Sequence, residues 1–270
     1  KLVGVLSLKR LLFASPKTPI RDLYEGKNLI FVTTSDSSEK VAKVMEKYDM
    51  VSVPVVDLQG KLVGRITIDD VVDVIKEEAD KDFQLASGIS EKVESNSSVF
   101  RISRARLPWL LIGMLGGILS AQVISRFETN ITHLPALAFF IPLITAMGGN
   151  VGVQSSAIIV QGLANNTISG SLWNRLVKEV SLSLLNGVIL ATILFVGSHF
   201  LLSVNIDLGI TVTVSLISVI VIASLIGTFI PLLLNRFGID PALATGPFIT
   251  TSNDICGILI YFSIAKLIDS

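Results

Sequence analysis

The chain has 270 residues, of which half are apolar and 16% are charged, with 22 Lys and Arg balancing 22 Asp and Glu. A neutral chain without a basic cluster gives no electrostatic basis for binding nucleic acid, and a single cysteine excludes an internal disulfide and a thiolate metal site. Residues 1–106 hold 33 of the 44 charges, so we expect a polar N-terminal part followed by a membrane-embedded part.

The polar part contains an internal repeat. The segment KLVGVLSLKRLL at residues 1–12 matches KLVGRITIDDVV at residues 61–72 in its first four letters and in the apolar pattern that follows. Hydrophobic spacing and turn residues predict the elements that lie between and after the two copies. In chain order these are an extended segment at 28–32, a helix at 38–49, strands at 51–56 and 62–68, and a helix at 69–79.

The order helix, strand, strand, helix around MVSVPVVDLQGKLVGRITIDDVV resembles a CBS module, the paired nucleotide-sensing unit. The resemblance implies a CBS region over residues 1–84, with the first copy partial and the second complete. In that family a Gly-x-apolar-Ser/Thr-x-x-Asp segment often binds adenosine phosphates, which makes Thr67 and Asp70 candidate nucleotide ligands and ATP a candidate cofactor. The alternative is that Thr67 and Asp70 only cap the helix that begins near Asp69.

That helix carries an unusual number of acidic residues. Asp69, Asp73 and Glu77 are spaced by four, and like charges at that spacing destabilise a helix by about 0.2–0.5 kcal/mol per pair. One interpretation is a solvated acidic face. The other is a weak divalent-cation sensor, because hard cations bind clustered carboxylate oxygens. The candidate sensor residues are Asp70, Asp73, Glu77, Glu78 and Asp82.

Beyond residue 106, five apolar stretches are long enough to cross the roughly 30 Å hydrocarbon core of a bilayer. Glycines in the second stretch predict that it is broken or kinked. Residues 85–106 are expected to supply a connecting (plug-like) helix and a linker. The predicted fold class is therefore an α+β module followed by an all-α polytopic membrane domain. The five spans are expected at 107–127, 134–163, 180–204, 209–237 and 241–268.

Basic residues beside the spans predict the orientation, because Lys and Arg concentrate on the cytoplasmic side. Six of them flank the spans on the side of the polar part and two flank the other side. We therefore expect a cytosolic N-terminus, an external C-terminus and a location in the inner cell membrane. The six are Arg101, Arg104, Arg106, Arg175, Lys178 and Arg236, and the two are Arg126 and Lys266.

One ionisable residue, Asp254, lies near the middle of an expected span. By insertion scales an Asp at that depth costs about 2.5–3.5 kcal/mol, so it indicates a function. No Lys or Arg lies at comparable depth to pair with it. It is therefore either protonated and hydrogen-bonded to a neighbour, or a carboxylate that faces water and a cation.

Polar neighbours favour the second interpretation. The fifth span has the run Thr250, Thr251, Ser252 and Asn253 before Asp254, and polar groups at this depth are tolerated only against protein or a wet cavity. The second span contributes Asn150 and Gln154, four apart on one helical face, beside glycines that permit close backbone approach. Small residues alone are also common helix-packing devices. The candidate pore-lining residues are Gly148, Gly149, Asn150, Gln154 and Asn253.

With PLITAMGGNVGVQSS in the second span and DPALATGPFITTSNDICG in the fifth, the chain resembles the MgtE-type magnesium channels. The resemblance implies a homodimer in the lipid bilayer, whose pore is lined by the second and fifth spans of both subunits. It makes Asp254 the central magnesium ligand and the carbonyl of Thr250 a contact. It also implies that intracellular Mg²⁺, acting on the CBS region and connecting helix, closes the pore, and that the family's N-terminal helical domain is missing.

Other functions find less support in the sequence. A proton-coupled transporter of Mg²⁺, Mn²⁺ or Co²⁺ that uses Asp254 as its carrier is the alternative we retain. An intramembrane aspartyl enzyme is disfavoured because each chain has a single membrane Asp. Other hydrolases lack a Ser/His arrangement or an HExxH motif. We therefore expect a transport protein and not an enzyme.

Overall fold

The computed structural model describes residues 1–24, 26, 29–165, 167–168 and 170–268. The chain divides into two compact units, Lys1–Asp80 and Lys81–Ser270.

The first unit is a small mixed α/β region. Its core is formed by Val32 of β1, Val41 and Met45 of α2, Val53 of β2 and Val71 of α3, all of which are buried. The three strands lie in the order β1-β2-β3, with β1 parallel and β3 antiparallel to β2. The elements are α1 (Leu8–Phe13), η1 (Ile20–Asp22), β1 (Val32–Thr33), α2 (Ser38–Lys47), β2 (Ser52–Val56), β3 (Leu62–Thr67) and the first part of α3 (Ile68–Ala86).

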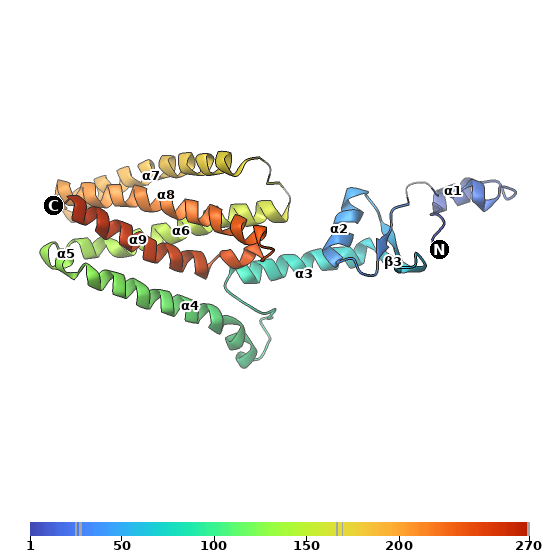
Figure 1. The fold of residues 1–270 in the computed structure, drawn as a ribbon, viewed down its shortest axis with the longest axis horizontal. Coiled ribbons are helices and arrows are strands. Elements are labelled where there is room, and N and C mark those ends of the chain that lie inside the picture. Colours follow the sequence, from blue (N-terminus) through green and yellow to red (C-terminus); the bar gives the residue numbers. More distant parts are fainter. Residues whose placement is uncertain (25, 27–28, 166, 169, 269–270) are drawn as a thin grey trace. The chain divides into compact units, whose positions relative to one another are not determined.

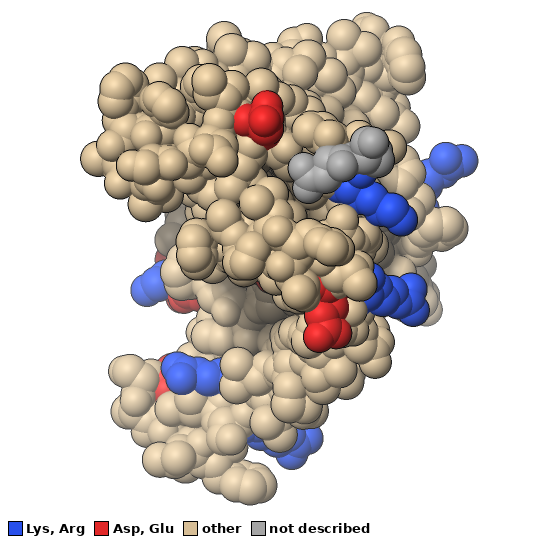
Figure 2. Space-filling model, turned by 90° about the vertical axis from the view of Figure 1, so that its left-hand side faces the viewer, with Lys and Arg blue, Asp and Glu red and all other residues tan. Residues whose placement is uncertain are grey.

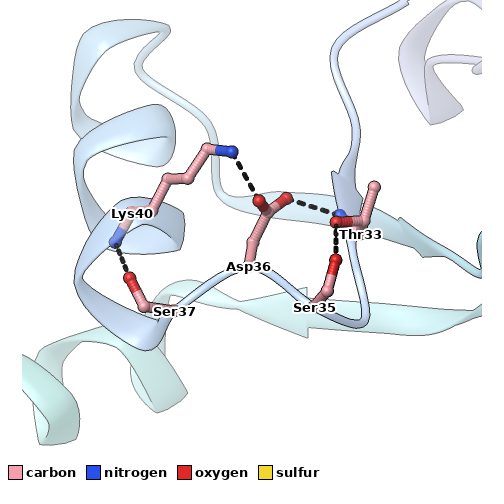
Figure 3. Close-up of polar contacts among 5 residues, drawn as sticks. All are labelled: Thr33, Ser35, Asp36, Ser37 and Lys40. Atoms are coloured by element: carbon pink, nitrogen blue, oxygen red, sulfur yellow. Dashed lines mark hydrogen bonds and ion pairs between the residues drawn. The ribbon is translucent and has the colours of Figure 1, made fainter.

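A polar network joins the end of β1 to the start of α2 (Figure 3). The Asp36 carboxylate accepts a hydrogen bond from the backbone N–H of Thr33 at 2.7 Å and pairs with the Lys40 ammonium. The Ser37 hydroxyl accepts from the backbone N–H of Lys40 and so caps the helix. The Lys40 and Thr33 bonds lower the pKa of Asp36 from 3.8 to about 2.

Two elements of this unit differ from their predicted extent. The extended segment expected from residue 28 appears as β1 at Val32–Thr33, and Asn28 lies outside the described residues. The helix expected to end at residue 79 continues to Ala86, because no glycine or proline interrupts it before Gly88. Gly88 has a φ of +76° and its N–H bonds to the Leu85 carbonyl, a glycine helix ending.

The segment expected to form a connecting helix is therefore arranged differently. The continuous helix α3 covers its first residues, residues 87–98 are not helical, and α4 begins at Val99. The Ser98 hydroxyl caps α4 by accepting from the Arg101 N–H. The linker between the two helices is fixed to α4, because the backbone N–H and the hydroxyl of Ser90 both donate to the Ala105 carbonyl at 2.9 Å.

The second unit is a bundle of helices (Figure 1). Five helices among the described residues are long and apolar enough to cross a membrane. A mixed α/β region followed by five long apolar helices confirms the predicted fold class. The elements are α4 (Val99–Arg126), α5 (Glu128–His133), α6 (Leu137–Ala164), α7 (Leu172–Leu202), α8 (Ile206–Arg236), η2 (Pro241–Ala244) and α9 (Pro247–Ile268).

Helix α8 lies at the centre of the bundle, against α6, α7 and α9, while α4 packs on α9 (Figure 1). Apolar residues of α6, α8 and α9 form its core, with Leu216, Ile220 and Tyr261 fully buried. The Tyr261 hydroxyl donates to the Leu137 carbonyl at 2.9 Å, which satisfies a polar group inside this core. The core thus holds α6 and α9 in a fixed relation.

The helix ends differ from the predicted spans for local reasons. Helix α7 begins at Leu172, capped by Ser171, because polar residues at a helix end remain helical outside the hydrocarbon. In the fifth span, η2 begins at Pro241, and Thr245 and Gly246, whose φ is +58°, separate η2 from α9. Helix α6 is continuous through Gly148 and Gly152, so the expected break at the glycines is absent from this described helix.

Charged side chains are few on the bundle end that carries α5 and the C-terminal end of α9. Figure 2 views the molecule from this end, where blue and red atoms are scattered among neutral ones. The expected external side of the membrane is thus poor in charge.

Candidate ion-binding site in the membrane domain

Asp254 is the eighth residue of α9, about 10 Å along the helix axis from its first residue. Its side chain is half-buried. Among the residues that the structure describes, none pairs with its carboxylate through a hydrogen bond or an ion pair. The interpretation of a hydrogen-bonded, protonated Asp254 therefore has no partner in the described part of this chain.

The backbone of α6 approaches α9 at this level. A β-carbon on Gly149 would lie 3.1 Å from the Thr250 methyl carbon and 3.9 Å from the nearer Asp254 carboxylate oxygen. Gly149 therefore lets the α6 backbone lie beside the carboxylate. The Thr250 hydroxyl donates to the Gly246 carbonyl of its own helix at 3.0 Å, which leaves its oxygen able to accept, and the Thr250 backbone carbonyl also keeps a spare lone pair.

Asn253 lies inside the contact between α6 and α9. It is 1% exposed, and its amide nitrogen donates to the Gly148 carbonyl at 3.2 Å, while its amide oxygen has no described partner. A β-carbon on Gly152 would lie 1.8 Å from that amide nitrogen. Asn253, expected to line the pore, is therefore buried within the single chain. Gly148 and Gly152 allow α6 to pack closely against it.

The other two candidate pore residues lie elsewhere on α6. Asn150 and Gln154 are exposed, while Gly148, Gly149 and Gly152 are buried. The structure therefore brings Asp254, Thr250 and Gly149 together and leaves the two amides on an outer face of α6.

A second carboxylate within a spanning helix, Glu179 of α7, was missed by the sequence reasoning. It is half-buried, and one of its oxygens accepts a hydrogen bond from the buried Ser155 hydroxyl of α6 at 2.6 Å. Ser155 follows Gly149 by six residues, about 9 Å along α6. The sequence signal for it is Ser171. As the N-cap residue it starts α7 at Leu172, so Glu179 lies within the helix.

In the first unit, the structure supports the capping role of Asp70. Its carboxylate accepts hydrogen bonds from the N–H of Thr67 at 3.1 Å and from the Thr67 hydroxyl at 2.8 Å. These bonds lower the pKa of Asp70. Asp70, the third residue of α3, thus reaches back to the N–H and the hydroxyl of Thr67, the residue before the helix.

The remaining candidate sensor residues all lie on α3. Asp73 and Glu77 are exposed, and Glu78 and Asp82 are half-buried. Within the described residues, no three acidic, His or Cys side chains are grouped to hold a metal ion. One chain alone therefore does not complete a cage, although hydrated Mg²⁺ needs only one or two carboxylates.

The end of α3 and the linker lie against the start of α9. A β-carbon on Gly246 would lie 2.3 Å from the Ala86 carbonyl oxygen, and one on Gly88 would lie 2.7 Å from a Pro247 ring carbon. Both glycines also have positive φ. Each position therefore favours glycine for two reasons, the backbone conformation and the lack of space for a β-carbon. The helix that carries Asp254 therefore begins in direct contact with the segment that leaves α3.

Comparison with known proteins gives the family. Residues 20–77 match the CBS domain, and residues 141–264 match MgtE, described as a divalent cation transporter. The magnesium transporter MgtE of Bacillus subtilis is 35% identical over 98% of this chain, that of Thermus thermophilus 37% over 99%, and that of Enterococcus faecalis 38% over 98%. The chain belongs to the MgtE family.

The MgtE family is one of transporters and not of enzymes. The chain spans 58% to 60% of the length of these three MgtE relatives. Among solved structures, the cytosolic domain of the Mg²⁺ channel MgtE in complex with ATP is 44% identical over 27% of this chain and 29% of that chain, with a TM-score of 0.27. The matches to the CBS domain and to MgtE, with the five candidate spans, confirm both expected components, a CBS region and a multi-pass MgtE membrane region.

Proposed function

We propose that this chain forms the regulatory and pore-forming part of a magnesium channel of the inner cell membrane, and that Asp254 binds the passing ion. The observation that carries the proposal is a half-buried carboxylate without a described partner, one third of the way along a spanning helix. The free-energy cost of placing this charged side chain inside the membrane is offset when the carboxylate binds a cation.

The chemistry of the site suits a hydrated ion. Mg²⁺ keeps several of its waters and is usually bound by one or two carboxylates rather than by an all-protein cage. One carboxylate and the spare lone pair of the Thr250 carbonyl can accept hydrogen bonds from those waters. A single charge per chain also keeps binding weak enough for release.

The outer face of α6 supports a homodimer. Asn150 and Gln154 are exposed on the single chain, and an amide that faces lipid would leave its polar atoms unpaired. A second copy, with water between the two α6 helices, satisfies these groups and lines a path with them. Two Asp254 carboxylates would then share one ion.

We further propose that the acidic helix α3 controls the pore. At low internal Mg²⁺ the carboxylates of α3 repel one another and those of the second copy. At high Mg²⁺ the bound cations cancel that repulsion and the pore closes. The contacts of Ala86 and Gly88 with the start of α9 connect α3 to the helix that carries Asp254.

The proposed topology places the N-terminus in the cytosol and the C-terminus outside. Arg101, Arg104 and Arg106 lie in the first two turns of α4, at the end expected inside. ATP remains a prediction from the CBS resemblance. The Thr67 hydroxyl already bonds to Asp70, so a nucleotide that uses either residue must replace that bond.

The test is Mg²⁺ uptake into liposomes that hold the purified chain, reported by a trapped magnesium indicator. Asp254→Asn keeps the side-chain shape but removes the charge, and we expect at least a tenfold loss of uptake. Asp207→Asn, at the exposed start of α8, is the matched control and should transport as the parent does. Unchanged uptake by Asp254→Asn would refute the role of Asp254.

The same liposomes test the retained alternative, a proton-coupled transporter. A trapped pH indicator would report proton movement that is coupled to uptake of the divalent ion. A channel moves Mg²⁺ without proton movement. Stoichiometric acidification or alkalisation that disappears in Asp254→Asn would favour the coupled transporter instead.

A further inference from the structure

A cavity of about 550 Å³ lies beside the start of α9. Its walls are the linker at residues 87–89, the side of α4 from Arg106 to Met114, and Pro247 of α9. Figure 1 shows α4 diverging from α9 toward its N-terminal end, where these residues lie. Two contacts hold the walls in place: Ser90 bonds to the Ala105 carbonyl, and Gly88 packs on Pro247.

Among the described residues that line the cavity, Arg106 alone is charged. Its side chain is exposed, and no described residue forms a hydrogen bond or an ion pair with it. The two neighbouring arginines differ, because Arg104 lies 3.4 Å from Glu91 and Arg101 donates to the Lys92 carbonyl. A guanidinium without a partner in an apolar cavity favours an anionic ligand.

The rest of the lining is suited to hydrocarbon. Leu110 and Met114 are 64% and 56% exposed, and a β-carbon on Gly113 would have no neighbour within 4 Å. Trp109, half-buried beside them, is of the residue type that concentrates at the level of lipid headgroups. The cavity thus has one cationic end at the expected cytoplasmic interface and an apolar groove that leads into the membrane.

We propose that this cavity binds an anionic phospholipid of the inner leaflet. The headgroup phosphate accepts hydrogen bonds from the Arg106 guanidinium, and an acyl chain lies along Leu110, Gly113 and Met114. Basic pockets beside spanning helices on the cytoplasmic side commonly hold such headgroups. The lipid would touch both the linker and Pro247, and it would therefore stabilise the junction between α3 and α9.

The test uses Trp109 as a reporter. The chain has two tryptophans, so Trp173→Phe leaves Trp109 as the single one. This variant is placed in bilayers that contain increasing mole fractions of brominated phosphatidylglycerol or of brominated phosphatidylcholine, and the quenching of its fluorescence is measured at each mole fraction. We expect the anionic lipid to quench at about fivefold lower mole fraction, the equivalent of about 1 kcal/mol for one arginine at the surface.

Arg106→Gln should abolish this preference, while Arg126→Gln, at the other end of α4, should keep it. Gly113→Leu, which fills the open space, should lower quenching by both lipids, and Gly117→Leu, another open position on α4, should not. Equal quenching by the two lipids, or a preference that survives Arg106→Gln, would overturn the proposal. So would protection of Trp109 from both lipids, since a second copy of the chain would then cover the cavity. None of these outcomes depends on whether the chain conducts Mg²⁺.

Discussion

Glycines determine how closely three helices meet around Asp254. A β-carbon on Gly227 of α8 would lie 2.3 Å from the Gly152 carbonyl oxygen, while Gly152 itself leaves room for the Asn253 amide. The backbones of α6, α8 and α9 therefore approach one another where a side chain would separate them. In a membrane, where lipid is as apolar as Leu, such close contact drives helix association.

The tightest of these positions gives a prediction of stability. Gly152→Ala places a methyl group 1.8 Å from the Asn253 amide nitrogen and 2.8 Å from an Ile249 methyl carbon, so the helices must separate. We expect a loss of about 1–3 kcal/mol, typical of an overpacked core. Thermal unfolding in detergent measures it. Gly197→Ala on α7, where a β-carbon meets nothing within 4 Å, should leave the midpoint unchanged or higher, and an equal loss in both variants would contradict the packing argument.

The sequence identified Asp254 and named Thr250 and Gly149 among the candidate site residues, but it did not show how closely they lie. A charge surrounded by apolar residues is visible in the sequence, whereas the closeness of Gly149 depends on tertiary packing. Glu179 was missed because the predicted span began at residue 180, whereas α7 begins at Leu172, and because its hydrogen-bond partner, Ser155, is on another helix. A hydroxyl that binds a carboxylate across two helices leaves no local pattern.

At the scale of elements, the start of α2 depends on a charged residue. Asp36 has a pKa of 3.8 when unperturbed and about 2 when it is bonded to Lys40 and Thr33 (Figure 3). A lowered pKa contributes stability that is present above pH 4 and is lost as the pH falls toward 2. The parent should therefore be more stable than Asp36→Asn at pH 5, and this difference should vanish near pH 2.

Unfolding of the full chain in detergent, followed by circular dichroism between pH 2 and 5, checks this expectation. Glu46→Gln, an exposed acid of α2 outside the network, is the control and should unfold as the parent does at each pH. A difference between Asp36→Asn and the parent that does not change with pH would show that the carboxylate's charge is not the stabilising factor.

The acidic residues of α3 give a second prediction at this scale. Asp73→Asn combined with Glu78→Gln removes two charges from the helix without shortening it. Magnesium should then close the pore less readily, because fewer carboxylates repel one another when the ion is absent and fewer bind it when it is present. Uptake as a function of internal Mg²⁺ should become flatter, and an unchanged curve would refute the sensor role.

A matched control is Glu39→Gln combined with Glu46→Gln on α2, two acids outside the acidic helix. This pair should respond to internal Mg²⁺ as the parent does. If it flattens the curve as much as the α3 variant, general surface charge and not α3 is responsible.

The existence and type of the elements could be predicted from hydrophobic spacing, but their ends could not. Helix α3 passes residue 79 because its next residues favour helix, and only Gly88 ends it. Helix α6 is continuous through its glycines because neighbouring helices pack there, whereas a glycine in an isolated helix weakens it. Tertiary contacts thus decide what local propensity leaves open.

At the scale of the whole molecule, the exposed amides of α6 predict how two copies meet. With Cys256 replaced by Ser, Gln154→Cys should form a disulfide-linked dimer on oxidation, because the outer face of α6 meets its copy in the proposed dimer. Non-reducing electrophoresis of native membranes shows the product. Val188→Cys, on the exposed side of α7, should remain monomeric, and equal cross-linking of the two variants would count against the proposed interface.

The division of the chain into a polar and an apolar part is its most predictable property, because 33 of the 44 charges precede residue 107. Any coupling between the polar part and the apolar part depends on the segment that joins them. That junction is built from Gly88, Gly246 and Pro247, residues that the sequence marks only as turn formers.

The contact between Ala86 and Gly246 has a mechanical consequence. The two main chains pack directly against each other there. Residue 246 has no side chain, and a methyl group in its place would lie 2.3 Å from the Ala86 oxygen. A side chain between two helices can change rotamer and absorb part of a displacement, whereas a peptide group cannot. Any shift of residue 86 toward residue 246 therefore acts directly on the main chain at the entrance to α9.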